Sequence, residues 1–287
     1  MKESPLFSIL IANYNNGPYL MDAIDSVRNQ SYSNWEIILV DDASTDCSHD
    51  LYALLENDTR IQIYFNKRNK GCGYTKRRCI ELAHGSVCGF LDPDDVLVND
   101  AIEIMMKEHL DFPDVSMVYS RYYYSDNNLN ILGTSEHQCK LPDETSFLLY
   151  GKGAISQFAA FKKEHYDRTP GINIHYRRAV DHALYYLLEE VGKIRFVDKP
   201  LYYYRFNTGN NISTNSNSDV AFFWDLIVMA EACMRRGLDI EKTIYDKFLQ
   251  HIYRKESEAY SMGEDHVRMT KTYKTGRIVL MPLKWLK

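Results

Sequence analysis

Short runs of apolar residues alternate with amphipathic segments along the first hundred residues. Four continuous apolar runs are typical of buried strands, and they cover residues 7–12, 35–40, 61–65 and 87–91. Apolar residues at helical spacing predict the intervening helices, over residues 19–29, through Leu51, Leu54 and Leu55, and over residues 74–83. Continuously apolar strands with helices between them predict an α/β fold, whose mainly parallel sheet is covered on both faces.

The pattern is less regular in the second half of the chain. Three further elements are predicted there, a strand over residues 115–119, a helix over residues 179–191 and a short strand over residues 194–197. Residues 126–143 indicate a loop or an irregular hairpin, and the Asn, Ser, Thr and Gly residues of 207–218 mark a loop or hinge. Two amphipathic helices are expected after it. The sequence therefore predicts an α/β domain over residues 1–215 and a helical C-terminal extension over residues 216–287.

Polar clusters follow three of the predicted strands, at residues 13–16, 41–42 and 92–95. Ligands of open parallel sheets bind beyond the carboxyl ends of the strands, so these clusters are expected to meet at one crevice. Asp92 and Asp94, one residue apart, could hold Mg²⁺ or Mn²⁺, which takes one or two protein carboxylates and completes its shell with water and phosphate. The alternative is an acidic turn that caps a helix starting near Asn99.

The second acidic cluster, Asp41-Asp42, is followed by capping residues. A carboxylate just beyond a strand can accept a hydrogen bond from a pyrimidine N–H or a ribose hydroxyl. We expect Ser44 or Asp46 to cap the following helix, and Asp41 and Asp42 lie too early in the chain for that role.

The composition of the chain limits the classes of ligand that the protein is expected to bind. A formal net charge of -5 argues against a nucleic-acid binder and favours a small-molecule or carbohydrate ligand. The 22 tyrosines suit sugar stacking but equally suit half-buried packing positions. The six cysteines have no paired metal-ligand spacing, and neither a signal peptide nor an apolar stretch of about 20 residues is evident. These features predict a cytoplasmic protein.

The motifs FSILIANYN, SVRNQ, WEIILVDDASTD and FLDPDD occur in this order across residues 6–100, with a Gly-rich turn and helix over residues 71–85. In order and spacing they resemble the family 2 glycosyltransferases, which have the Rossmann-like GT-A fold. The resemblance implies transfer of a sugar from a nucleotide sugar, most simply a UDP-sugar, with inversion at the anomeric carbon. It also implies Mn²⁺ or Mg²⁺ as cofactor and a saccharide or lipid-linked saccharide acceptor, in assembly of a bacterial surface polysaccharide.

The resemblance also assigns roles at the ends of the first strands. The backbone of Ala12 and Tyr14 is expected to contact the nucleobase, and Asp42 is expected to read it. Asp92, the first aspartate of the DxD motif, would contact the ribose or a metal-bound water. Asp94 would bind the metal directly.

The resemblance extends to four positions later in the site. Lys76 stands where the family has an arginine, and a cation there would meet the base or the diphosphate as a point charge. Asp181, at the start of a late helix, is the expected general base that takes the proton of the acceptor hydroxyl. Arg205 is expected to contact the diphosphate, and Asn207 replaces a histidine that can complete the metal shell.

Two alternatives stay open, and a third is discounted. Residues 276–287 mix aliphatic and basic side chains, which suits either peripheral contact with the inner membrane or docking within the protein. Lys76 and Asn207 depart from the family pattern, so a non-catalytic member that only binds nucleotide or polysaccharide is the alternative function. A sugar-phosphate nucleotidylyltransferase should carry a basic, Gly-rich phosphate loop after the first strand, where this chain has Asn-Tyr-Asn-Asn.

Overall fold

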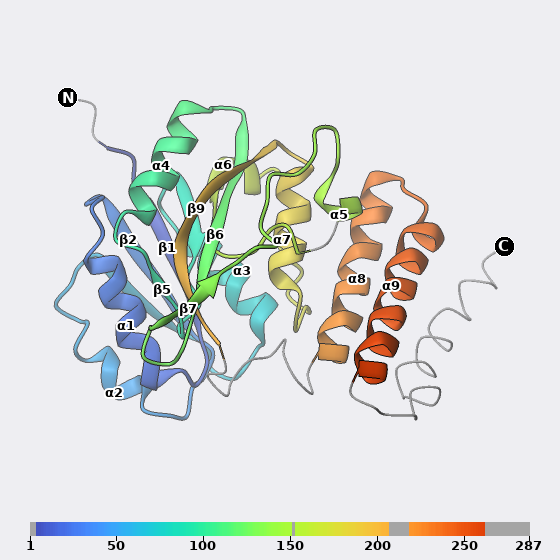
Figure 1. The fold of residues 1–287 in the computed structure, drawn as a ribbon. Coiled ribbons are helices and arrows are strands. Elements are labelled where there is room, and N and C mark those ends of the chain that lie inside the picture. Colours follow the sequence, from blue (N-terminus) through green and yellow to red (C-terminus); the bar gives the residue numbers. More distant parts are fainter. Residues whose placement is uncertain (1–3, 151–152, 207–217, 262–287) are drawn as a thin grey trace. The chain divides into compact units, whose positions relative to one another are not determined.

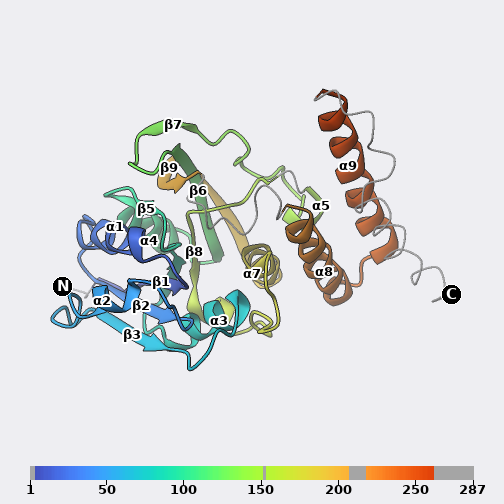
Figure 2. The ribbon, with the colours of Figure 1, turned by 90° about the horizontal axis from the view of Figure 1, so that it is seen from below.

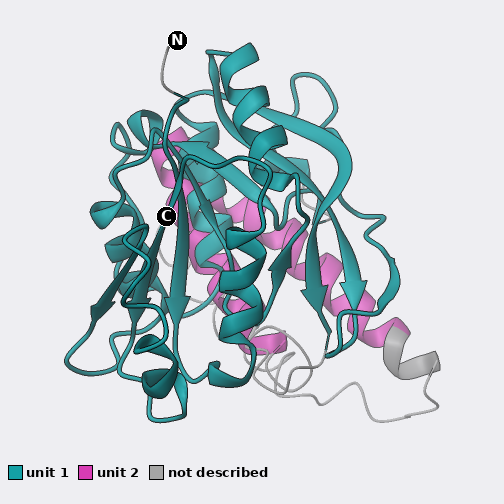
Figure 3. Ribbon diagram, turned by 90° about the vertical axis from the view of Figure 1, so that its left-hand side faces the viewer, with its two compact units in different colours: residues 1–214 teal, residues 215–287 magenta. Residues whose placement is uncertain are grey.

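The computed structural model describes residues 4–150, 153–206 and 218–261. The chain divides into two compact units, residues 1–214 and residues 215–287 (Figure 3). Asn207 and residues 276–287 lie outside the described residues, so the predictions made for them stay predictions. In the described part of the chain, none of the helices combines the length and apolar character needed to cross a membrane.

A mixed sheet forms the frame of the first unit. Within the described residues it has nine strands, in the order β3-β2-β1-β4-β8-β6-β9-β5, with β7 paired to β6. The strands are β1 (Phe7–Asn13), β2 (Trp35–Asp41), β3 (Ile61–Phe65), β4 (Val87–Phe90), β5 (Val96–Leu97), β6 (Val115–Ser125), β7 (Ile131–Thr134), β8 (Ala159–Lys162) and β9 (Lys193–Arg205). The predicted parallel pairing runs through β3, β2, β1 and β4, and β6 pairs in parallel with β9.

Helices cover both faces of this sheet, as the continuous apolar strands require. They are α1 (Gly17–Arg28), α2 (Ser48–Tyr52), α3 (Cys72–Leu82), α4 (Ala101–Asp111), α5 (Phe147–Tyr150), α6 (Lys163–Tyr166) and α7 (Val180–Glu189). Figures 1 and 2 show α1 and α4 on one face, with α3 and α7 on the other. On the α1 side, Phe7, Ile9 and Ile11 of β1 join one core cluster with Leu20 and Met105.

The second half of the sheet differs from the sequence prediction. The antiparallel strand β8 inserts between β4 and β6, where no strand was expected. Strands β6 and β9 also run much further than the predicted residues 115–119 and 194–197, because each continues to pair with the other up to Ser125 and Arg205. The irregular hairpin predicted after β6 is present as the β6–β7 pair. The extensions of β6 and β9 contain several half-buried tyrosines, so neither a continuous apolar run nor a regular alternation marks them in the sequence.

The second unit contains α8 (Ser218–Arg236) and α9 (Ile240–Ser261), in agreement with the predicted pair of helices. The helices pack against each other. The rings of Phe222 and His251 stack between them at a centroid distance of 3.8 Å. Gly237 has a φ of 63°, a left-handed conformation that ends α8 and lets the chain reverse.

The first turn of α3 is packed unusually closely against the segment that precedes α7. The Gly73 amide donates a hydrogen bond to the Tyr176 carbonyl oxygen at 2.9 Å. A Cβ atom on Gly73 would lie 2.6 Å from the Asn173 carbonyl oxygen and 2.7 Å from that of Tyr176. Both atoms belong to the backbone and cannot rotate away, so this contact requires glycine.

We therefore expect Gly73→Ala to lower the free energy of unfolding by about 1–3 kcal/mol, the usual cost of overpacking, despite the better helix propensity of alanine. Urea unfolding followed by circular dichroism measures the change. Gly133→Ala is the matched control, because a Cβ atom there meets nothing within 4 Å. Equal stability of the two variants would show that the α3 contact tolerates a side chain.

Candidate active site

The ends of β1 and β2 are joined by a buried polar network. The Tyr52 hydroxyl donates to Asp41 Oδ2 at 2.5 Å, and the Ser44 amide donates to Asp41 Oδ1 at 2.9 Å. Burial, followed by the hydrogen bond to Asp41, raises the pKa of Tyr52, so the phenol stays protonated as a donor. Asp41 therefore supports the turn after β2.

The capping role expected for Ser44 is wrong. Helix α2 begins at Ser48 without a side-chain cap from the preceding residue, and the Ser44 hydroxyl instead accepts the Asn15 amide at 2.9 Å. Asp46 links the two turns, because it accepts the Ser48 amide at 3.0 Å and the Gly17 amide at 2.8 Å. These polar side chains join the β1 turn to the β2 turn, since both strands end at the same edge of the sheet.

Asp42 is buried and fixes the loop that leads into α3. Its Oδ1 accepts Asn66 Nδ2 at 2.7 Å and the Lys70 amide at 2.8 Å, and its Oδ2 accepts the Gly71 amide at 2.7 Å. Asp42 thus holds the start of α3 at the carboxyl end of β2. Its predicted contact with a nucleobase stays a prediction, as do those of Ala12 and of Tyr14, whose residue surface is 46% exposed.

Three non-glycine residues beside the predicted site residues have positive φ angles. Asn15 follows Tyr14 with a φ of 58°, Ala43 follows Asp42 with a φ of 64°, and Ala179 precedes the helix of Asp181 with a φ of 54°. Such conformations cost of order 1 kcal/mol or more and concentrate where a protein holds functional groups. Two of them lie in the turns after β1 and β2 and the third lies directly before α7, so each adjoins a predicted site residue.

The structure brings Lys76, Asp92 and Asp181 into contact. The Lys76 ammonium lies 2.6 Å from Asp181 Oδ1 and 3.3 Å from Asp92 Oδ1. The lysine side chain is 6% exposed, whereas those of Asp92 and Asp181 are 33% and 40% exposed. Two partly accessible carboxylates therefore share one buried cation at the carboxyl end of β4.

The thiol of Cys72 experiences the charges of the same three residues and that of Asp42. Burial raises the pKa of Cys72 to about 12; the positive charge of Lys76 opposes that rise, and the negative charges of Asp181, Asp92 and Asp42 add to it. The electrostatic environment of this one side chain thus includes charged residues from α3, from α7 and from the turns after β2 and β4. No local sequence signal singles out Cys72.

The DPDD turn after β4 presents its three carboxylates differently. Asp95 points inward, where it accepts the Tyr202 hydroxyl at 2.9 Å and the Arg205 amide at 2.8 Å. Burial, together with the neighbouring Asp94 and Asp92, raises the pKa of Asp95. Asp92 and Asp94 are only half-buried, so they are the carboxylates of this turn that a ligand can reach.

Asp92 and Asp94 would suit a divalent cation whose remaining ligands are phosphate oxygens. Over residues 4–150, 153–206 and 218–261, no group of three or more His, Cys, Asp or Glu residues could hold a metal by itself. Mg²⁺ usually needs only one or two protein carboxylates when a substrate diphosphate supplies further oxygens. Asp92 and Asp94 can supply that contribution.

The family follows from comparison of the chain with known proteins. Residues 8–181 match the model of the family described as "Glycosyl transferase family 2". The chain belongs to this family. The GlyG glycosyltransferase of Streptococcus pneumoniae is 28% identical over 258 residues, which cover 83% of each chain. The chondroitin synthase of Escherichia coli is 29% identical over 217 residues, or 74% of this chain but only 30% of that relative.

The fold agrees with that of solved family structures. Residues 1–349 of S. aureus TarS, in complex with UDP-GlcNAc, superimpose with a TM-score of 0.67 at 18% identity, over 89% of this chain and 75% of that TarS chain. The expected GT-A architecture, an α/β sheet with flanking helices, is therefore confirmed.

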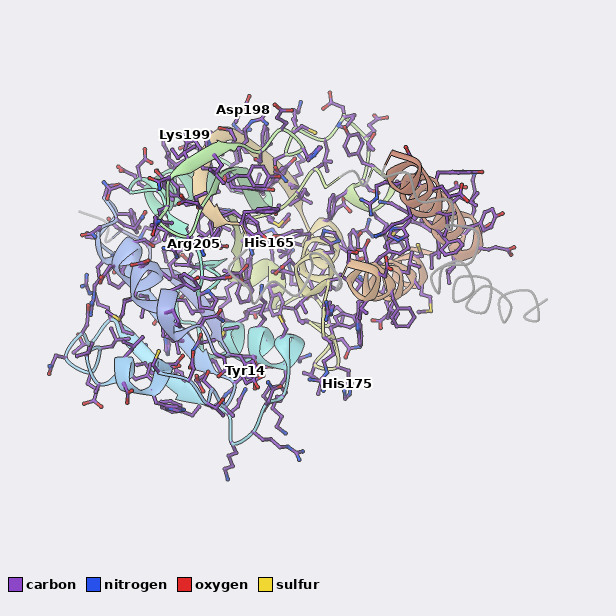
Figure 4. All side chains as sticks on the ribbon, turned by 60° about the horizontal axis from the view of Figure 1, so that its bottom comes forward. Tyr14, His165, His175, Asp198, Lys199 and Arg205 are labelled. Atoms are coloured by element: carbon purple, nitrogen blue, oxygen red, sulfur yellow. The ribbon has the colours of Figure 1, made fainter. Side chains whose placement is uncertain are left out.

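Arg205 of this glycosyltransferase lies behind the DPDD turn, at the end of β9 that points away from Asp198 and Lys199 in Figure 4. Its side chain is buried and makes three hydrogen bonds. They run to the Asp94 carbonyl oxygen at 2.8 Å, to Asp22 Oδ2 at 2.5 Å and to the Asn127 carbonyl oxygen at 3.2 Å. These contacts make Arg205 a support of the turn, and the predicted diphosphate contact stays a prediction.

Asp22 and Tyr202 also stabilise the DPDD turn, through Arg205 and Asp95, and were not predicted from the sequence. Asp22 lies 183 positions before its partner Arg205, and the Tyr202 hydroxyl donates to Asp95 across 107 positions. Neither residue belongs to a recognisable motif. An acidic residue on the exposed side of a helix gives no local signal that it pairs with a distant arginine.

We expect Arg205→Met to lower the free energy of unfolding of the glycosyltransferase by about 1–3 kcal/mol, because it leaves two carbonyl oxygens and the Asp22 carboxylate without their donor. Urea unfolding measures the loss. Lys140→Met is the control, since Lys140 forms a surface pair with Asp143 and its side chain is 75% exposed; such pairs contribute about 0–1 kcal/mol. Similar losses in the two variants would contradict the supporting role.

Proposed function

We propose that this chain is an inverting, metal-assisted glycosyltransferase that moves a sugar from a UDP-sugar to a saccharide or lipid-linked saccharide, as a step in polysaccharide assembly. The observation that carries the proposal is the meeting of Asp181 with Asp92 at the carboxyl end of the sheet. A base candidate and a DxD carboxylate come from segments far apart in the chain and share one cation. A purely structural acidic turn would not require this arrangement.

The relatives support the choice of donor and product. A structural neighbour has been solved with UDP-GlcNAc, and similar sequences are named chondroitin synthase and, in Pasteurella multocida, hyaluronan synthase. These names favour a UDP-sugar donor and a polysaccharide product. The chain spans 30% and 21% of the length of those two synthases, so its own acceptor is proposed at the level of a saccharide.

The donor would lie along the ends of β1, β2 and β4. The backbone of Ala12 and Tyr14 and the carboxylate of Asp42 would face the nucleobase. Asp94, with Asp92 beside it, would hold Mn²⁺ or Mg²⁺ against the diphosphate, where the cation neutralises the charge of the leaving group.

Asp181 would act as the general base. Its carboxylate takes the proton of the acceptor hydroxyl as the hydroxyl oxygen forms a bond to the anomeric carbon. The bond between the anomeric carbon and the diphosphate oxygen breaks on the opposite face, and UDP leaves with the bonding electron pair. Attack opposite to the leaving group inverts the anomeric centre.

Calorimetric titration of UDP tests the donor site. In Mn²⁺ we expect saturable binding that EDTA abolishes, and we expect Asp94→Ala to weaken it by at least about 10–100-fold, as loss of a ligand-shell residue does. Asp143→Ala is the control, because Asp143 pairs with Lys140 at an exposed site. UDP affinity that is equal in Mn²⁺ and in EDTA would exclude the metal-assisted site. Absence of UDP binding in every condition would exclude the UDP donor.

Turnover tests the base. Release of UDP from a panel of UDP-sugars, with water as acceptor, identifies a donor even when the natural acceptor is not identified. We expect Asp181→Asn to reduce kcat on that donor by about 100–10,000-fold, because general-base catalysis is lost. Its affinity for UDP should stay close to that of the parent protein. Full activity of Asp181→Asn would rule out Asp181 as the base, and proton NMR of the released sugar reports whether the anomeric centre is inverted.

A further inference from the structure

Lys76 is the common partner of the proposed base and of the first DxD carboxylate. Its ammonium is 2.6 Å from Asp181 Oδ1 but 3.3 Å from Asp92 Oδ1, so the contact with Asp181 is the closer one. The ammonium also lies 4.9 Å from the centre of the Phe90 ring. An aromatic face on one side and two carboxylates on the other leave the lysine little freedom to move.

The backbone sets the distance between Lys76 and Asp181. The hydrogen bond from the Gly73 amide to the Tyr176 carbonyl oxygen joins the first turn of α3 to the segment before α7. Arg177 Nη1 adds a second link when it donates to the Lys70 carbonyl oxygen at 3.2 Å. Lys76 lies one turn after Gly73, and Asp181 lies in the first turn of α7. The ion pair therefore follows from two packed elements.

Charge explains why a cation is needed there. Without the ammonium that contacts both of them, the partly exposed carboxylates of Asp92 and Asp181 would repel each other. The Lys76 side chain is only 6% exposed, so both of its ion pairs are largely shielded from bulk water. The fixed ammonium group holds Oδ1 of Asp181 in place.

We propose that Lys76 is a positioning residue for the base, one that binds Oδ1 of Asp181 and so leaves the second carboxylate oxygen to take the acceptor proton. The inference rests on the proposed function and deepens it. The 40% exposure of the Asp181 side chain provides the access that this second oxygen needs. The sequence-based expectation for Lys76 is different, because it assigns the lysine to the base or diphosphate of the donor.

The two roles make opposite kinetic predictions. A residue that positions the base acts on kcat, whereas a residue that binds the donor equally in the ground state and transition state acts on KM. The experiment measures UDP release from the best UDP-sugar in Mn²⁺, with water as acceptor, for Lys76→Met, Lys76→Gln and Lys76→Arg. UDP affinity is measured by calorimetry on the same proteins, and thermal unfolding confirms that each is folded.

We expect Lys76→Met and Lys76→Gln to reduce kcat by about 100-fold, the effect of a displaced catalytic group, while KM and the Kd for UDP change by less than about threefold. Lys76→Arg keeps the charge and should recover at least about tenfold of that loss. In an Asp181→Asn background, Lys76→Met should have no further effect on kcat, because both changes disable the same group.

Three results would overturn the inference: an unchanged kcat, a loss confined to KM and UDP affinity, or full additivity of Lys76→Met with Asp181→Asn. Because Lys76→Gln keeps a polar donor in the buried position, it provides the comparison if Lys76→Met does not fold. Absence of UDP release by the parent protein with every UDP-sugar would instead contradict the proposed function. The two failures are therefore distinguishable.

Discussion

The close approach of α3 to the segment before α7 is the constraint on which the site depends. At Gly73, two backbone carbonyl oxygens occupy the space that a side chain would need, and the amide of this glycine is bonded to one of them. Asp42 holds the preceding loop through the amides of Lys70 and Gly71. With the start of α3 fixed in this way, its next turn places a lysine between carboxylates from two other elements.

The acidic residues at the strand ends divide into supports and accessible groups. Asp41 and Asp95 are buried and accept hydrogen bonds from tyrosine hydroxyls and backbone amides. Asp92 and Asp94 keep part of their surface open. Burying a charged carboxylate is costly unless donors surround it, and in the DPDD turn the well-satisfied Asp95 fixes the backbone that presents Asp92 and Asp94. The acidic motifs therefore contain residues that stabilise the turns beside the residues to which we assign a function.

A residue of β9, the last strand of the sheet along the chain, stabilises the DPDD turn that follows β4. Arg205, at the end of β9, bonds to the Asp94 carbonyl oxygen and to Asp22 of α1. Its guanidinium lies 5.0 Å from the centre of the Tyr19 ring, so α1 holds it by both charge and aromatic contact. Its planar fork of donors suits a position where several acceptors converge from different directions. The turn is thus held by α1 and by the end of β9 together.

Much of the fold could be predicted from local sequence. Continuous apolar runs and helical periodicity located β1 to β4, α1 and α3 within a few residues, because buried parallel strands leave an unambiguous hydropathy pattern. The motif order predicted the family, and strand ends marked Asp42, Asp92 and Asp94 as neighbours. The antiparallel strand β8 and the full length of the β6–β9 pair were missed, since β8 is only four residues long and the extensions of β6 and β9 contain runs of consecutive tyrosines that match no single period.

The sequence by itself determined which residue types stand at the ends of the parallel strands, because those positions follow from hydropathy and chain order alone. Only the tertiary structure decided which aspartates point inward, that Arg205 braces the turn with Asp22, and that Lys76 pairs with Asp181. The physical reason is sequence distance. Lys76 and Asp181 are 105 positions apart, and no local pattern encodes a contact that arises only when α3 and α7 dock on the same face of the sheet.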